Sequence, residues 1–150
     1  MMSPGHYLQL RRRAAGLSVL ATASALVALP AALRRATSRE INRMAERLYA
    51  AEADTAPLNT PQIRLLADVV PLDHGTYARL SVAHQLGIDA HLRICTGCGC
   101  TDLLACAPPS GPCAWSANQP DLCTACEEDH LADLVATAAQ IAARYAVATL

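Results

Sequence analysis

The residues best suited to chemistry are seven cysteines that crowd into one short stretch of the chain. They lie within 32 residues and are Cys95, Cys98, Cys100, Cys106, Cys113, Cys123 and Cys126. The first two and the last two form C-x-x-C pairs. Two thiolates at this spacing can bind one metal ion from a tight turn, and two such pairs complete a tetrahedron. The spacing therefore predicts a segment that is held together by metal.

The number of ligands favours one or two zinc ions. One ion among the two C-x-x-C pairs leaves Cys100, Cys106 and Cys113 over, and with His130 these would complete a second tetrahedral site. A bridged dinuclear site built from the thiolates also fits, because spacing does not reveal how ligands pair. An iron–sulfur cluster is the minor alternative, since four cysteines could hold one, but paired C-x-x-C knuckles suit zinc better.

The cysteine segment, residues 95–126, needs such a metal in order to fold. Its large apolar residues are few, namely Leu103, Leu104, Trp115 and Leu122. These cannot offset an ordering entropy of about 1–2 kcal/mol per residue. Structural zinc contributes on the order of 10–16 kcal/mol in small peptides and can close that gap. We expect Trp115 to cover the metal site, with stacking on a base or on a partner's side chain as the alternative.

The same residues resemble a known type of module. The pattern comprises Cys95-x-x-Cys98-Gly99-Cys100-Thr101, Ala105-Cys106, Cys113-x-Trp115 and Asp121-Leu122-Cys123-x-x-Cys126. It is similar to a cysteine-rich module that recurs in uncharacterised bacterial and phage-related proteins. The resemblance covers about residues 93–127 and implies zinc binding by the same cysteines, without implying an activity. The loop 107–112 is richer in proline than the Gly-rich link of those modules.

Helical patterns dominate the rest of the chain. Periodic apolar residues predict helices over 38–51, 60–70 and 73–86, and a short strand over 90–94. The predicted fold is therefore mainly α, with a small, loop-rich, metal-stapled zinc module between helices. The expected parts are an apolar Ala-rich helical segment with basic flanks at 1–35, a helical region at 36–92, the cysteine-rich zinc module at 93–130 and an amphipathic C-terminal helix at 131–150.

Charge is distributed unevenly along the chain, although the whole carries only −1. Residues 1–50 hold eight Arg against two Glu, a net of +6, whereas residues 95–150 hold one Arg against six acids, a net of −5. Arg39, Arg43 and Arg47 lie off the apolar stripe of helix 38–51. A solvated face is the plain interpretation of these arginines, and a contact with DNA or a partner protein is the sharper one. The acidic half is poorly suited to wrapping nucleic acid unaided.

An apolar run of 20 residues, from Ala14 to Leu33, bears on location. Its length matches a helix that crosses a bilayer, and its basic start matches a signal peptide. Its many small residues and Pro30 instead favour an ordinary helix buried against its neighbours or a second copy. Zinc thiolates belong in a reducing compartment, so we expect a cytoplasmic protein. The alternative is an inner-membrane protein, anchored through residues 14–33, with its cysteine module in the cytoplasm.

The sequence shows no nucleophile paired with a base and no phosphate-binding glycine loop, so we expect no enzyme. The predicted function is that of a non-enzymatic zinc-binding protein whose structural module serves recognition of a protein or a nucleic acid. A homo-oligomer fits the amphipathic C-terminal helix. The alternatives are the membrane-anchored protein and a thiol redox or metal sensor whose thiolates themselves react.

Overall fold

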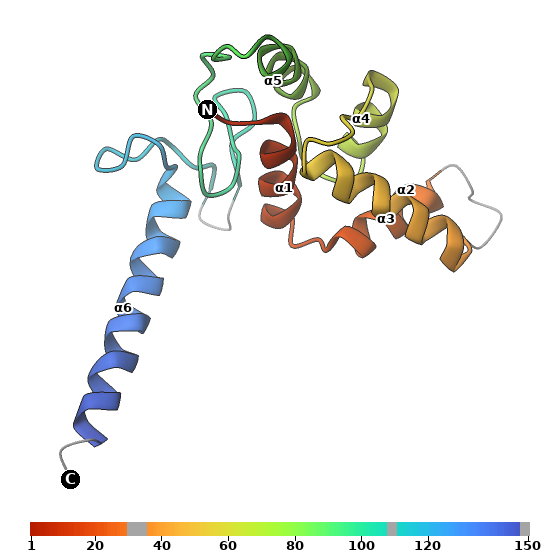
Figure 1. The fold of residues 1–150 in the computed structure, drawn as a ribbon. Coiled ribbons are helices and arrows are strands. Elements are labelled where there is room, and N and C mark those ends of the chain that lie inside the picture. Colours follow the sequence, from red (N-terminus) through yellow and green to blue (C-terminus); the bar gives the residue numbers. More distant parts are fainter. Residues whose placement is uncertain (30–35, 108–110, 148–150) are drawn as a thin grey trace. The chain divides into compact units, whose positions relative to one another are not determined.

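The computed structural model describes residues 1–29, 36–107 and 111–147, and these are mainly helical, as predicted. The helices of these ranges are α1 Pro4–Ala14, α2 Val19–Ala28, α3 Ser38–Glu52, α4 Thr60–Ala67, α5 His74–Leu86 and α6 Thr124–Val147 (Figure 1). The chain divides into two compact units, Met1–Leu104 with α1 to α5 and Ala105–Leu150 with α6.

Side chains cap α3 and α4 at their amino ends. Thr37 accepts a hydrogen bond from the backbone N–H of Glu40, and Asn59 accepts one from that of Gln62. In both cases the acidic or amide side chain bonds back to the backbone of the capping residue, which completes a capping box. These reciprocal bonds set where each helix begins.

The carboxyl end of α4 differs from the prediction. The apolar stripe continues to Val70, but the helix ends at Ala67 and the chain then tightens into turns. Proline disfavours helical backbone in the residue before it, so Val70 cannot continue the helix into Pro71. Val70 is nevertheless fully buried, and its N–H donates to the Leu66 carbonyl over 2.8 Å.

The strand predicted over 90–94 is wrong. Within the described residues only Ile94 makes a bridge there, an isolated antiparallel one to Thr101. The two residues bracket the first cysteine turn, so the extended backbone is too short to form a ladder.

The apolar run of the sequence does not form one helix. Helix α1 ends at Ala14, the chain turns through Gly16 with φ +69°, and α2 begins at Val19. Pro30 to Leu33 lie outside the described residues. In the part of the chain that is described, every helix is too short or too polar to cross a membrane.

The core of the first unit lies among α1 to α5. Tyr7, Leu8, Leu48 and Leu66 are almost fully buried in it. Two tyrosine hydroxyls accept hydrogen bonds from backbone N–H groups of loops at the edge of this core. Tyr7 accepts from Asp73 N–H and Tyr77 accepts from Leu58 N–H, each over 3.0 Å. Each bond ties a loop to a helix.

A buried ion pair joins α1 to the end of α3. Arg12 Nε donates to Glu52 Oε1 over 2.5 Å and Arg12 Nη2 to Glu52 Oε2 over 2.8 Å. Arg12 Nη1 also donates to the Leu17 carbonyl over 2.6 Å, in the turn before α2. Arg12 is therefore buried and links α1, the end of α3 and the turn before α2, and it does not add to the exposed positive charge of residues 1–50.

The second unit consists of loops followed by α6. An isolated bridge between Trp115 and Cys123 closes the loop that leads into the helix. Farther along α6, the apolar residues Leu131, Leu134 and Val135 are 51%, 54% and 70% exposed. They occupy positions i, i+3 and i+4 and so form one stripe on the helix surface.

Candidate metal centre

The first three cysteines sit on a tight turn. The N–H of Gly99 donates to the Cys95 carbonyl over 2.8 Å, and the N–H of Cys95 donates to the Cys100 carbonyl over 2.9 Å. Gly99 has φ +73°, a backbone conformation that side chains disfavour. The turn presents Cys95, Cys98 and Cys100 on buried positions.

Arg11 of α1 packs against this turn. It is 4% exposed, and its Nε donates to the Pro71 carbonyl over 2.6 Å, while its Nη1 reaches the Cys98 carbonyl at 3.4 Å. A methyl group added at Gly99 would lie 3.0 Å from Arg11 Cδ and 3.2 Å from Leu10 Cβ. The turn therefore packs directly on α1, and a side chain at position 99 would force Arg11 or Leu10 to shift.

Sequence reasoning missed Arg11, because Arg11, Arg12 and Arg13 read together as a basic flank of the apolar run. The available signal was helical position. Pro4, Tyr7, Leu8 and Arg11 fall at i, i+3, i+4 and i+7, so Arg11 shares the apolar face of α1.

The other four cysteines lie in the second unit. The N–H of Cys113 donates to the Cys106 carbonyl over 2.9 Å, and the sulfurs of Cys106 and Cys123 are 3.6 Å apart. Cys123 comes directly before α6, and Cys126 lies in its first turn. The bonds from Thr124 N–H to Ala114 O, 2.8 Å, and from Glu127 N–H to Cys123 O, 2.9 Å, hold this helix start in place.

The cysteines gather into two groups that could each hold a metal ion. One group is Cys95, Cys98, Cys123 and Cys126, and the other is Cys98, Cys100, Cys106 and Cys123. Within each group the sulfur atoms lie within 4.8 Å of one another. All seven cysteines lie in the described residues, and none of them forms a disulfide bond.

The first group contains the four cysteines of the two C-x-x-C pairs, which the spacing placed on one ion. The second group differs from the predicted second set, because it draws on Cys98 and Cys123 in place of Cys113 and His130. Cys113 contacts Cys106 but belongs to neither of the groups found among the described residues. His130 is exposed on α6 and likewise lies outside both groups.

Two of the thiols, those of Cys98 and Cys106, have a raised pKa. A hydrogen bond with Cys95, together with burial, raises the pKa of Cys98 far above its usual value. Burial, followed by hydrogen bonds with Cys113 and Cys123, raises the pKa of Cys106 to about 12. A metal ion must displace these protons, so metal binding releases protons and weakens as pH falls.

The donor set fits a soft metal ion. All ligands in both groups are sulfur, and four of the six cysteines involved are buried. Sulfurs around tetrahedral zinc, at about 2.3 Å from the ion, lie about 3.8 Å from one another. The 3.6 Å separation of the Cys106 and Cys123 sulfurs is close to that spacing.

Of the remaining predicted site residues, Trp115 lies beside one of the cysteines, and the three arginines lie on α3. Trp115 is half-buried and pairs with Cys123 through backbone. Arg39, Arg43 and Arg47 are exposed on α3 in the first unit.

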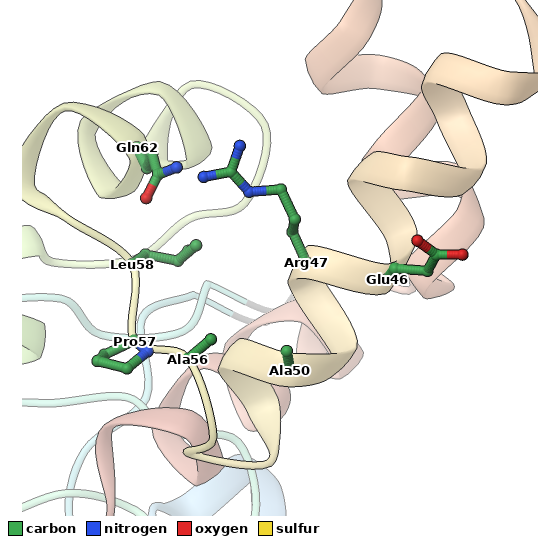
Figure 2. A pocket seen from close by; sticks show the side chains of 7 residues that line it. All are labelled: Glu46, Arg47, Ala50, Ala56, Pro57, Leu58 and Gln62. Carbon is green, nitrogen blue, oxygen red and sulfur yellow. The ribbon is translucent and has the colours of Figure 1, made fainter.

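Arg47 borders a small cavity between α3 and the loop before α4, with a volume of about 240 Å³. Figure 2 shows Arg47 reaching toward Gln62, while Glu46 points away. Ligand pockets usually exceed about 300 Å³. The lining of this cavity offers no nucleophile paired with a base.

No family model, curated protein or solved structure matches this chain.

Proposed function

We propose that this chain is a non-enzymatic zinc-binding protein in which zinc has a structural role. The observation that carries the proposal is the group of four sulfurs from Cys95, Cys98, Cys123 and Cys126, which lie within 4.8 Å of one another. Thiolate sulfur selects zinc, copper(I) or iron–sulfur clusters over hard cations. Paired C-x-x-C knuckles favour zinc among these.

A structural role follows from the ligand count. A zinc ion with four thiolate ligands is closed, whereas a catalytic zinc keeps one position open for water or substrate. The cysteine segment also has few large apolar residues, so metal binding is the main source of the free energy that orders it. Zinc would thus act as part of the fold.

We further propose that the protein recognises a partner protein through α6. This helix has 24 residues, and its apolar stripe of Leu131, Leu134 and Val135 is more than half exposed. Such a stripe on an amphipathic helix fits an apolar groove or a matching helix. The acidic residues at the start of α6, Glu127, Glu128 and Asp129, disfavour nucleic acid as the partner of this surface.

The exposed arginines of α3 support nucleic acid as a second candidate partner. Arg39, Arg43 and Arg47 recur every four residues, so they share one face of the helix. Glu46 borders the same face and lowers its net positive charge. For this reason we rank this surface below α6.

The zinc role is tested by chelation and refilling of the full-length chain. Trp115 is the one tryptophan of the sequence and lies beside Cys123, so its fluorescence reports on the cysteine segment. We expect a chelator to change this fluorescence and to remove near-UV circular dichroism, and stoichiometric zinc to restore both. An unchanged signal in fully metal-free protein would show that zinc is not structural.

The choice of partner is tested with two matched variants. Leu131→Gln combined with Leu134→Gln alters the α6 stripe, and Arg39→Gln combined with Arg43→Gln alters the α3 face. Sedimentation measures self-association, and fluorescence anisotropy at low and high salt measures binding to duplex DNA. Self-association that only the α6 variant abolishes supports protein recognition. Salt-sensitive DNA binding that only the α3 variant abolishes supports the second candidate.

A further inference from the structure

The two cysteine groups have two members in common. Cys98 and Cys123 occur in both, whereas Cys95 and Cys126 occur only in the first and Cys100 and Cys106 only in the second. One ion could occupy either group, or two ions could be bound at once and share the common sulfurs. The contacts of the sulfurs distinguish these arrangements.

Cys98 stands in the middle of its turn. Its thiol is hydrogen-bonded with both Cys95 and Cys100, one from each group. A single tetrahedral ion bound by Cys95 and Cys98 would leave the neighbouring thiol of Cys100 buried without a metal. A second ion that also binds Cys98 uses that thiol.

Cys123 has the same relationship in the second unit. Its sulfur lies 3.6 Å from that of Cys106, which belongs only to the second group. Cys126 follows three residues later in the first turn of α6 and belongs only to the first. Each shared sulfur therefore has one neighbour from each group, as a sulfur that bridges two ions requires.

Charge favours shared ligands over two separate sites. Two Zn²⁺ ions with six thiolates carry a net charge of −2. The separate sites that the seven cysteines and His130 could form, one with four thiolates and one with three thiolates and a histidine, together carry −3. The smaller charge costs less to bury. The guanidinium of Arg11, buried against the Cys98 carbonyl, lies where it can stabilise this anionic centre.

We propose that six cysteines bind two zinc ions in one bridged cluster. Cys95 and Cys126 are terminal ligands of one ion, Cys100 and Cys106 are terminal ligands of the other, and Cys98 and Cys123 bind both. Six thiols lose their protons to solvent as the two ions bind, and no electrons are exchanged. Cys113 remains outside the cluster. The inference rests on the proposed zinc binding and specifies its stoichiometry and connectivity.

The test replaces zinc with cadmium-113 in the full-length protein and records its NMR spectrum together with the metal content. We expect two cadmium ions per chain and two resonances, each split by coupling to the other ion through the bridging sulfurs. Two unsplit resonances would mean separate sites, and a single resonance would mean a single ion, and either overturns the cluster. Protein that binds neither zinc nor cadmium would instead overturn the proposed function itself.

Variants give an independent check of connectivity. We expect Cys95→Ser to retain one ion per chain, Cys98→Ser to weaken the binding of both ions, and Cys113→Ser to retain two. If Cys113→Ser loses an ion, or if Cys98→Ser and Cys95→Ser lose metal equally, the assignment of bridging and terminal ligands is wrong. The coupling measured on the unmodified chain decides the question even if a variant fails to fold.

Discussion

The guanidinium of Arg11 lies beneath the turn that carries Cys98. Its Nη1 reaches the Cys98 carbonyl at 3.4 Å, and its Nε is anchored on the Pro71 carbonyl at 2.6 Å. One arginine of α1 thus connects the loop before α5 with the first cysteine turn, although the three positions are far apart in sequence. Helix α1 therefore helps to hold the backbone of the turn that carries Cys98.

Replacing Arg11 by Met should weaken both the fold and metal binding. A hydrogen bond to a charged group contributes about 1.5–3 kcal/mol, and the buried carbonyl of Pro71 would lose its donor. We expect the free energy of unfolding to fall by about that amount, and zinc to be lost to a competing chelator at lower chelator concentration. Urea unfolding and chelator competition measure the two effects.

Arg13→Met is the matched control, because Arg13 is exposed on the same helix. It should leave stability within about 0.5 kcal/mol and zinc affinity unchanged. Equal effects of the two substitutions would contradict the role given to Arg11.

Gly99→Ala should be more damaging than Gly87→Ala. Both glycines have positive φ, +73° and +66°, so both substitutions carry the backbone cost of about 1–2 kcal/mol. At Gly99 the added methyl group also meets Arg11 Cδ at 3.0 Å, whereas nothing lies within 4 Å at Gly87. We expect only Gly99→Ala to lower zinc affinity, as measured by chelator competition. Zinc affinities that agree in the two variants would show that the packing of the turn on α1 does not matter.

Removing one member of the Arg12–Glu52 pair should lower the free energy of unfolding strongly, whereas replacing both members by apolar residues should lower it much less. Removing one partner of a buried ion pair costs about 3–5 kcal/mol, because it leaves the other charge without compensation. Glu52→Met should therefore destabilise strongly, and the double variant with Arg12→Met should recover much of the loss. Urea unfolding of the two single variants and the double variant measures the coupling, and simple additivity would contradict it.

Asp73 should contribute stability that depends on pH. Burial works to raise the pKa of Asp73, but hydrogen bonds from Thr76 and Gly75 outweigh it and hold this pKa below its usual value. A lowered pKa in the folded state stabilises above the unfolded pKa of about 3.9, and this stability is lost as pH falls through the folded value. Asp73→Ala should cost about 1 kcal/mol at pH 7 through loss of the α5 cap, and less as the pH approaches the folded pKa. Thermal unfolding against pH measures this, and a cost that stays constant down to acid pH would contradict it.

Much of the helical part of the fold could be predicted from local signals. Helix α5 begins at its Asp73 cap and ends before Gly87, because these residues specify helix ends without help from the rest of the chain. Helix α4 ends at Ala67, where the chain tightens into turns that close on Leu65 and Leu66, and Pro71 disfavours helical backbone at Val70 only. Tyr49 follows Ile41 by eight residues and so falls on the apolar stripe of α3 by periodicity, yet it is 58% exposed, because periodicity does not say how far the neighbouring elements extend.

The metal centre could be predicted only in part, for a different reason. The C-x-x-C spacing places Cys95 with Cys98 and Cys123 with Cys126, because each pair shares a turn. How Cys100, Cys106 and Cys113 divide depends on contacts between distant segments, which spacing does not encode. The role of Arg11 depends in the same way on the packing of α1 against the turn of Cys98, which lies 87 residues later in the sequence.

Native mass spectrometry of the full-length chain, purified without a tag or added metal, tests the central claim most directly. It counts the ions bound to each folded molecule. The account predicts a mass equal to the chain plus two zinc ions less the displaced thiol protons, and loss of both ions on acidification. A folded chain at its metal-free mass would contradict the account.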